Sequence, residues 1–312
     1  MLSSFWEAAG AKLAERWAAI SAPALVFWLG GLLAWVRSKG GFHALKEPAD
    51  WLAKQSTPAQ ITIVLMILLG VSASGVIIER LTTPVLRLLE GWYWPCFLKP
   101  LRHKLVEWKK AKATEDMKRY QELTPAVDAG TASSEQLTEH GRIALLQRRS
   151  PSPAPDMPTR IGNTLRAAET SPKYKYGLGV VSVWPHLWLL LPDTARKEIA
   201  TARVSLDASV AACIWGVLFV LFAPWTLWAV PAGLGVAVVA VMAWVPSRAE
   251  VYADLLEAGF DLYRRTLYEQ LRWPPPRNPR DERTQGELLT RYLVRGSDGT
   301  IPVWDGDHRS PP

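Results

Sequence analysis

Few residues of this chain have the types and spacing that enzymes use. Asp305, Asp307 and His308 together offer two carboxylates and an imidazole, which are donors that metal sites use. They lie, however, in a Gly- and Pro-containing stretch that offers no rigid scaffold for coordination geometry. The Gly-Leu-Gly runs at 177–179 and 233–235 lack the third glycine of a phosphate-binding loop, and no Gly-x-Ser-x-Gly, His-Glu-x-x-His or cysteine-pair motif occurs. We therefore expect no enzyme, with no catalytic residue, no metal and no cofactor.

Long uncharged stretches dominate the rest of the chain, in which 49% of the residues are hydrophobic and 21% are charged. Residues 17–36 and 55–78 contain no charged side chain, and each stretch is long enough to cross a bilayer as a helix. Residues 208–247 are also uncharged but too long for one crossing, so prolines in the middle predict a hairpin of two spans near 208–224 and 229–246. The sequence thus predicts an all-α integral membrane protein with four transmembrane helices.

The distribution of Lys and Arg predicts how these spans are oriented. With four spans, both termini and the segment 79–207 lie on one side of the membrane, and that side carries more of the cations near the span ends. Because such cations are enriched on the cytosolic side, we expect a multi-pass protein of the cell inner membrane with both termini cytosolic. No small-residue cleavage site follows the first span, which predicts an uncleaved anchor.

The predicted spans carry small residues and hydroxyls instead of ionisable groups. Small residues four positions apart lie on one helix face and let a second helix approach closely. The lack of ionisable side chains at membrane depth argues against ion-coupled transport, whereas a narrow uncharged pore stays open as an alternative. The residues predicted to serve helix packing, or to line such a pore, are Gly70, Ser72, Ser74, Ala212, Gly216, Gly233 and Ala237.

Aromatic and cationic residues flank the predicted spans. Trp and Tyr favour the depth of lipid headgroups, and Lys and Arg favour anionic lipid on the cytosolic face. We therefore expect basic helices over 79–123 that contact an anionic bilayer, except that from Lys109 to about Tyr120 we favour a solvated helix that projects into the cytosol. We attribute the net charge of +7 to orientation and lipid contact, not to nucleic acid. The predicted interface or lipid contacts are Trp92, Tyr93, Trp94, Trp184 and Trp188.

The segment VVSVWPHLWLLLP, Val180 to Pro192, has too few apolar residues to cross a bilayer as a helix, and Pro185 removes a backbone donor in its middle. We favour a position buried within a cytosolic helical layer, while an interfacial and a re-entrant, pore-lining position stay open. A helix over 195–207 is predicted to lead directly into the third span.

The last part of the chain is predicted to form a long amphipathic helix over 247–272, started by a capping box of Ser247 and Glu250. Its apolar stripe needs a partner, which we expect to be the 195–207 helix, the 98–120 helix, or the same helix of another subunit. The stripe consists of Tyr252, Leu256, Tyr263, Leu267 and Leu271.

Two segments have compositions typical of flexible chain. Residues 124–158 are rich in Thr, Ser, Pro, Gly and Ala and show no periodic apolar face, which predicts a disordered linker. Residues 273–312 predict a Pro-rich and mostly flexible tail, with a short helix near 286–294.

Three runs, PTRIGNTLRAAE, YKYGLG and WPHLWLLLPD, precede the second pair of spans. Their order resembles a pattern of uncharacterised bacterial four-span integral membrane proteins, common in actinobacteria, and the resemblance covers about 157–272. It implies a bacterial cell membrane, and no activity comes with it.

These observations predict a non-enzymatic membrane scaffold or interaction module that forms a homo-oligomer or docks a protein partner through cytosolic helices. The alternative is a homo-oligomeric channel with an uncharged pore. The predicted organisation, in chain order, is a cytosolic N-terminus (1–16), a first transmembrane pair (17–78), basic helices (79–123), a linker (124–158), a cytosolic helical segment (159–207), a transmembrane hairpin (208–246), an amphipathic helix (247–272) and a tail (273–312).

Overall fold

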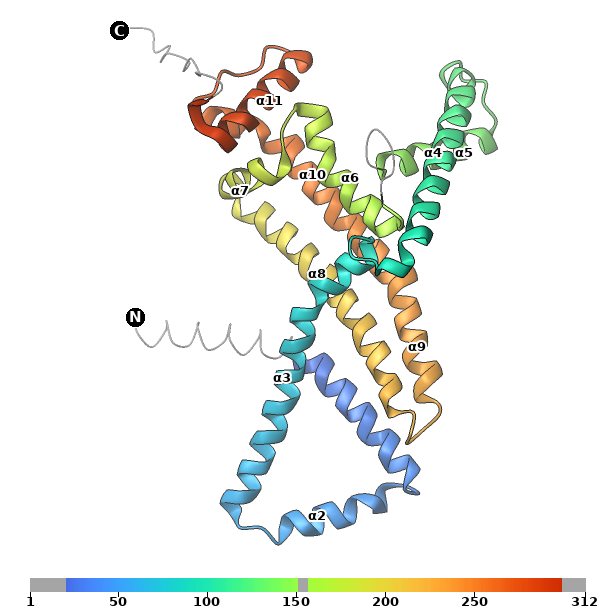
Figure 1. The fold of residues 1–312 in the computed structure, drawn as a ribbon, viewed down its shortest axis with the longest axis vertical. Helices are drawn as coiled ribbons and strands as arrows, with labels where there is room; N and C mark the ends of the chain where they lie inside the picture. Colours follow the sequence, from blue (N-terminus) through green and yellow to red (C-terminus); the bar gives the residue numbers. More distant parts are fainter. Residues whose placement is uncertain (1–20, 151–156, 299–312) are drawn as a thin grey trace. The chain divides into compact units, whose positions relative to one another are not determined.

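The computed structural model describes residues 21–150 and 157–298, and there it is all-α, as predicted. The chain divides into two compact units: unit 1 comprises Met1–Leu86 and Leu206–Val245, and unit 2 comprises Arg87–Ser205 and Pro246–Pro312. Residues 21–38 are helical, and ten α-helices follow in the described part (Figure 1). They are α2 (Lys46–Ala53), α3 (Thr57–Glu90), α4 (Lys99–Asp128), α5 (Ser134–Arg148), α6 (Arg160–Tyr176), α7 (Val180–Leu190), α8 (Asp193–Phe219), α9 (Ala229–Val239), α10 (Val245–Gln270) and α11 (Pro279–Arg295).

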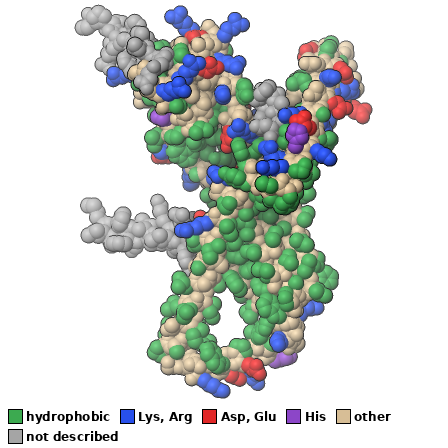
Figure 2. All heavy atoms as spheres, viewed as in Figure 1, with side chains coloured by type: hydrophobic (Ala, Val, Ile, Leu, Met, Phe, Trp, Pro, Cys, Tyr) green, Lys and Arg blue, Asp and Glu red, His purple; other side chains and the backbone are tan. Residues whose placement is uncertain are grey.

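Three of the described helices are long and apolar enough to cross a membrane: Thr57–Glu90, Asp193–Phe222 and Ala229–Gln270. Only 22% to 28% of the most apolar window of each helix is buried inside the protein, so lipid could cover the remainder. Figure 2 shows hydrophobic side chains gathered over the helices of unit 1. The first predicted span, 17–36, lies partly outside the described residues.

Aromatic packing joins residues 21–38 to the hairpin of α8 and α9 within unit 1. The ring centroid of Phe27 lies 4.6 Å from that of Trp215 and 5.0 Å from that of Phe222. Gly31 makes room for this cluster, because a Cβ at that position would lie 2.2 Å from the Phe222 ring. Such ring pairs contribute packing energy beyond their buried area.

Helices α6, α7, α10 and α11 enclose the apolar core of unit 2. The core holds side chains that are almost fully inaccessible to solvent, and it contains residues from the predicted stripe of α10 and from the Val180 to Pro192 segment. Its buried members are Leu178, Val183, Leu187, Phe260, Leu267, Tyr268, Trp273 and Leu289.

The glycine that follows α6 explains how α11 reaches this core. Gly177 ends α6 in the left-handed conformation, with φ of 72°, which glycine adopts without steric cost. The backbones then meet closely, since a Cβ on Gly177 would lie 2.0 Å from the carbonyl oxygen of Arg283 and one on Gly286 would lie 1.9 Å from that of Tyr176. The Gly-Leu-Gly run at 177–179 is thus a helix end and a packing contact.

The prediction of a disordered linker over 124–158 is wrong for most of that range. Helix α4 continues to Asp128, and α5 occupies Ser134–Arg148. The Ser133 hydroxyl accepts a hydrogen bond from the Gln136 amide, and the Gln136 side chain accepts one from the Ser133 amide. This capping box satisfies two donors at the start of α5 and outweighs the loop-like composition. Residues 151–156 lie outside the described residues.

The prediction of a new helix at Ser247 is also wrong. The helix runs without interruption from Ala229 to Gln270, and Ser247 lies inside it. Pro246 would normally break a helix, because it lacks an amide donor and clashes with the preceding turn. A π-helical turn at Ala240–Trp244 directly precedes it, and such a turn rearranges the hydrogen bonds that the proline disturbs.

The prediction of a mostly flexible tail over 273–312 is wrong for its first part. Helix α11 is longer than expected, and the side chain of Asn278 caps it by accepting from the amides of Arg280 and Asp281. Trp273 is buried and donates through Nε1 to Gln285 of α11, at 3.1 Å. These contacts fold α11 back onto the core of unit 2. Residues 299–312, which include Asp305, Asp307 and His308, lie outside the described residues.

Candidate functional site

Two of the predicted small residues bring the helices of the membrane hairpin together. A Cβ on Gly216 would lie 2.8 Å from the backbone nitrogen of Ala237, and one on Gly233 would lie 2.5 Å from the carbonyl oxygen of Gly216. Ala237 is buried beside Cys213, and Ala212 lies half-buried on the same helix as Gly216. The hairpin of unit 1 therefore uses this spacing for close helix contact.

The predicted hydroxyls of α3 contact the helix over 21–38. Ser72 donates to the carbonyl oxygen of Leu68 at 2.7 Å and lies within 3.4 Å of the Ser21 hydroxyl, which donates to it. Ser74 accepts a hydrogen bond of 3.1 Å from the Trp28 indole. Gly70 has open space where its Cβ would be. Ser72 and Ser74 thus serve contacts between helices of unit 1.

The predicted aromatic cluster lies in the connection between α3 and α4. Trp92 and Tyr93 are exposed, and each has a guanidinium over its ring: Arg166 lies 5.5 Å from the Trp92 centroid, and Arg87 lies 6.0 Å from the Tyr93 centroid. Trp94 donates to the carbonyl oxygen of Leu88 and is half-buried. Such cation–π pairs present an aromatic and cationic surface.

The first half of α4 continues this surface. Phe97 is 77% exposed, and Leu101 and Trp108 are exposed at helical spacing behind it. Burial, with a further contribution from the nearby cations Lys112 and Arg160, lowers the pKa of Lys109. The cations of this half of α4 are Lys99, Arg102, Lys104, Lys109, Lys110 and Lys112.

Helices α4 and α5 form a hairpin whose facing sides pack against each other. Leu123 and Ile143 are buried, and the rings of Tyr120 and His140 stack with centroids 4.2 Å apart. The outer face is different. Leu137 and Leu145 are 50% and 55% exposed there, and Gly141 between them has open space where its Cβ would be. We call Leu137, Gly141 and Leu145 the α5 stripe.

The predicted stripe of α10 is covered within this chain. Leu267 is fully buried and Tyr263 and Leu271 are partly buried in the core formed with α6, α7 and α11. Leu256 is buried beside Ala168 of α6. None of the three predicted partner helices supplies this core, so the expectation that they cover the stripe is wrong for these residues. Tyr252 contacts the predicted 195–207 helix, with Arg203 of α8 5.7 Å from its ring centroid.

The Val180 to Pro192 segment is a helix that is buried on one side. Val183 and Leu187 of α7 are inaccessible in the core, whereas Val181 and Leu189 are exposed on the other face. Trp184 lies against Phe260 of α10, with centroids 5.5 Å apart. The prediction of a buried position thus holds for one face of this helix only. The ring of Trp188 lies beside that of Trp184, with centroids 5.6 Å apart.

An ion-pair network joins α10 to α5 and α6, and the sequence reasoning missed it. Arg149 and Arg160 both pair with Glu250, at 2.8 Å and 2.6 Å. Glu257 accepts from Ser171 and pairs with Lys175 and Arg148. The sequence predicts Glu250 only as part of a capping box, and tertiary structure is needed to show which cations reach Glu250 and Glu257.

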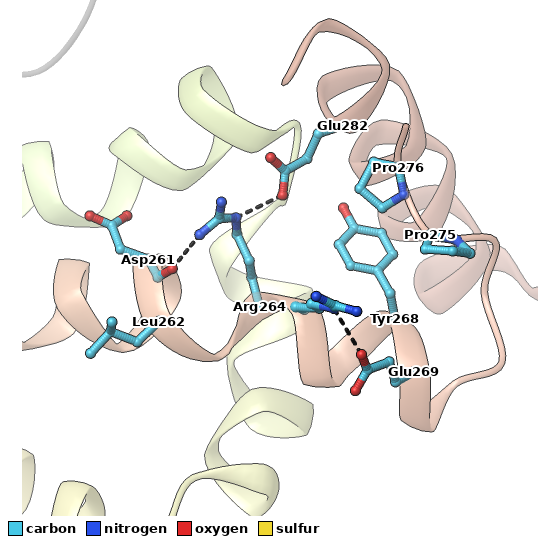
Figure 3. A pocket seen from close by; sticks show the side chains of 9 residues that line it. Asp261, Leu262, Arg264, Tyr268, Glu269, Pro275, Pro276 and Glu282 are labelled. Atoms are coloured by element: carbon cyan, nitrogen blue, oxygen red, sulfur yellow. Dashed lines mark hydrogen bonds and ion pairs between the residues drawn. The ribbon is translucent and has the colours of Figure 1, made fainter. Parts of the chain in front are cut away.

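Helices α10 and α11 and the connection between them line a cavity of about 490 Å³ that is partly open to solvent, and sequence reasoning did not anticipate it. Figure 3 shows the Tyr268 hydroxyl directed between the Glu282 carboxylate and the ring of Pro276. Arg264 donates through Nε to Glu282 at 2.7 Å and through Nη1 to the carbonyl oxygen of Asp261. The residues that line the cavity are Asp261, Leu262, Arg264, Arg265, Tyr268, Glu269, Pro275, Pro276 and Glu282.

Within residues 21–150 and 157–298, no group of three or more His, Cys, Asp or Glu side chains is arranged to hold a metal ion. Comparisons with protein-family models, curated proteins and solved structures found no match to this chain. The class that the described part of the chain defines is a helical protein with three helices long and apolar enough to cross a membrane, divided into two compact units.

Proposed function

We propose that this protein is a non-enzymatic interaction module of a bacterial inner membrane, anchored by four spans and carrying unit 2 on the cytosolic side. In this proposal unit 2 docks a second copy of the chain or a protein partner. The membership of a bacterial four-span family and the cytosolic position of both termini are parts of the same proposal. The four spans and their orientation are supported by the uncharged stretches, the Lys and Arg distribution and the three long apolar helices of the described residues. The family membership rests on the order of the runs PTRIGNTLRAAE, YKYGLG and WPHLWLLLPD.

The observation that carries the docking proposal is the α5 stripe. Single exposed apolar side chains are ordinary on protein surfaces, but Leu137 and Leu145 flank a glycine on one helix face, and this face is turned away from α4. A small residue between two large apolar ones lets another helix approach closely and bury both. The capping box and the Arg119–Glu139 pair hold this helix in place for such a contact.

The contacts of the predicted pore residues favour the module over the channel. A pore needs its hydroxyls open to water, whereas Ser72 and Ser74 bond to neighbouring backbone and to residues 21 and 28. The space beside Gly216 and beside Gly233 is likewise occupied by backbone atoms of the facing helix. These contacts are what a helix bundle requires for packing.

Photo-cross-linking tests the docking proposal. A benzophenone amino acid placed at Leu145 should give a discrete adduct on irradiation of cells, because this side chain points into the proposed interface. An adduct of twice the chain mass, with a matching mass by light scattering in mild detergent, identifies a second copy, and any other discrete mass identifies a partner. The double variant Leu137→Asn and Leu145→Asn should abolish the association.

The matched control places the benzophenone at Val294 of α11, which is exposed to a similar degree and lies outside the α5 stripe. This position should give no discrete adduct. The absence of any adduct at Leu145, together with a monomeric mass in detergent, would contradict the proposal. A closed ring that conducts ions in liposomes would instead favour the channel.

A further inference from the structure

The α10–α11 cavity contains a buried hydroxyl without a partner. Tyr268 is 1% exposed, and its hydroxyl has no hydrogen-bond partner among the residues that the structure describes. A buried hydroxyl that bonds to nothing destabilises the fold. Figure 3 shows this hydroxyl at the wall of a cavity large enough for a small molecule. A ligand that bonds to the hydroxyl would remove this cost.

The cations at the cavity are already engaged. Arg264 bonds to Glu282 and to the Asp261 carbonyl, and its guanidinium stacks on the Tyr176 ring with 4.1 Å to the centroid. Arg265 donates to Glu269 at 2.9 Å. Neither guanidinium therefore offers the open fork that recognises a phosphate or a carboxylate.

The oxygen atoms at the cavity are better placed to receive a donor. Asp261 already accepts from the Tyr176 hydroxyl at 2.7 Å. Burial and the hydrogen bond to Asp261 raise the pKa of Tyr176 to about 12, so this phenol keeps its proton and continues to donate at neutral pH. The acceptors that face the cavity are then the Tyr268 hydroxyl and the Glu282 carboxylate, and Pro275 and Pro276 supply an apolar wall.

We propose that the α10–α11 cavity binds a small organic cation with a primary ammonium group on a short alkyl chain. The ammonium donates to the Tyr268 hydroxyl and to the Glu282 carboxylate, and the methylene groups pack on Pro275 and Pro276. Three carboxylates and two guanidiniums line the cavity, and each guanidinium pairs with one of these carboxylates, so the lining carries one negative charge in excess, which favours a cation. This site is independent of the docking proposed for α5.

Calorimetry with the purified full-length chain and putrescine as the probe tests this site. Wild type should bind putrescine, and Tyr268→Phe should bind about 10-fold more weakly, because it removes one hydrogen bond to a charged group and keeps the ring. Without putrescine, Tyr268→Phe should unfold at a higher temperature than wild type, since its cavity no longer contains an unpartnered hydroxyl. Putrescine should raise the unfolding temperature of wild type more than that of the variant.

The pair Glu282→Gln and Glu287→Gln separates a specific site from general attraction of cations. Both changes remove one negative charge from α11, but Glu287 is exposed and lies outside the cavity. Only Glu282→Gln should weaken binding. Equal affinity in wild type and Tyr268→Phe would overturn the proposal, as would equal losses in the two Gln variants, or binding of inorganic phosphate or glycerol in place of putrescine.

Discussion

At the scale of single residues, Arg119 and Glu139 join the two helices of the α4–α5 hairpin. The guanidinium donates through Nε and Nη2 to the two carboxylate oxygens, at 3.2 Å and 3.1 Å. A two-point pair of this kind fixes geometry as well as charge. The hydrogen bond from Arg119 lowers the pKa of Glu139 below its ordinary value. Because the folded pKa is lowered, this pair stabilises the hairpin above the ordinary pKa and is lost as the pH falls through the lowered value.

We therefore expect the amides of α5 to lose protection against hydrogen exchange, after correction for intrinsic rates, when the pH is lowered below about 4. Glu139→Gln should show weaker protection already at neutral pH and a smaller change on acidification. Glu115→Gln, which removes an exposed acid of α4, should behave like wild type. An identical pH dependence in wild type and Glu139→Gln would show that another group controls the hairpin.

Some single residues could be predicted from the sequence, and others could not. The four-residue spacing from Gly233 to Ala237 is visible in the sequence, because both lie on one helix face. No sequence pattern marks Tyr268 as a site residue, because its hydroxyl is buried only when α11 folds back onto α10. The cations that pair with Glu250 and Glu257 come from α5, α6 and the segments that flank them, at distances in sequence that local patterns do not report.

At the scale of elements, α4 is a cationic helix with an exposed aromatic edge, and we infer that it lies against anionic lipid. Phe97, Leu101 and Trp108 are exposed beside six cations between residues 99 and 112. Each Lys or Arg near an anionic membrane surface contributes about 1 kcal/mol. The short connection over 91–98 follows directly after α3, one of the three helices that could cross the membrane.

An environment-sensitive dye tests this contact in nanodiscs. With Cys96→Ser and Cys213→Ala as the background, a dye on Leu101→Cys should shift to shorter wavelength in phosphatidylglycerol relative to phosphatidylcholine. High salt should reduce the shift, because the attraction is screened, and Lys104→Gln with Lys112→Gln should reduce it as well. A dye on Leu137→Cys serves as the control and should respond to neither lipid. Equal emission at Leu101 in both lipids would argue against anionic lipid contact.

The elements also show where composition misleads. The existence of α3, α8 and the helix beyond α9 follows from long apolar runs, which is a strong signal. The segment of α5 and the first part of α11 have compositions rich in Ser, Thr, Gly or Pro, which predict flexible chain, and only 286–294 of α11 is predicted to be helical. Local signals were nevertheless present, in the Ser133 to Gln136 capping box and in the Asn278-Pro279 start of α11. At Ser247 a similar motif lay inside a continuous helix, because the preceding π turn accommodates Pro246.

At the scale of the whole molecule, apolar and charged residues are divided between two units. Unit 1 contains the apolar windows of the long helices, whereas the ion-pair network and the α10–α11 cavity lie in unit 2. The proposed function requires that unit 2 is cytosolic and that the turn over 223–228 is exposed on the opposite side of the membrane. The docking surface and the lipid contact both depend on this orientation, because each requires a cytosolic unit 2.

Cysteine accessibility tests this claim most directly. The background carries Cys96→Ser and Cys213→Ala, and each variant adds one cysteine, at His43, Thr226, Thr131 or Ser297. Cells whose outer membrane or wall has been made permeable, with the inner membrane intact, are treated with a membrane-impermeant maleimide. The account predicts that His43→Cys and Thr226→Cys react in intact cells, and that Thr131→Cys and Ser297→Cys react only after the inner membrane is permeabilised. Reaction of Thr131→Cys or Ser297→Cys in intact cells would contradict it.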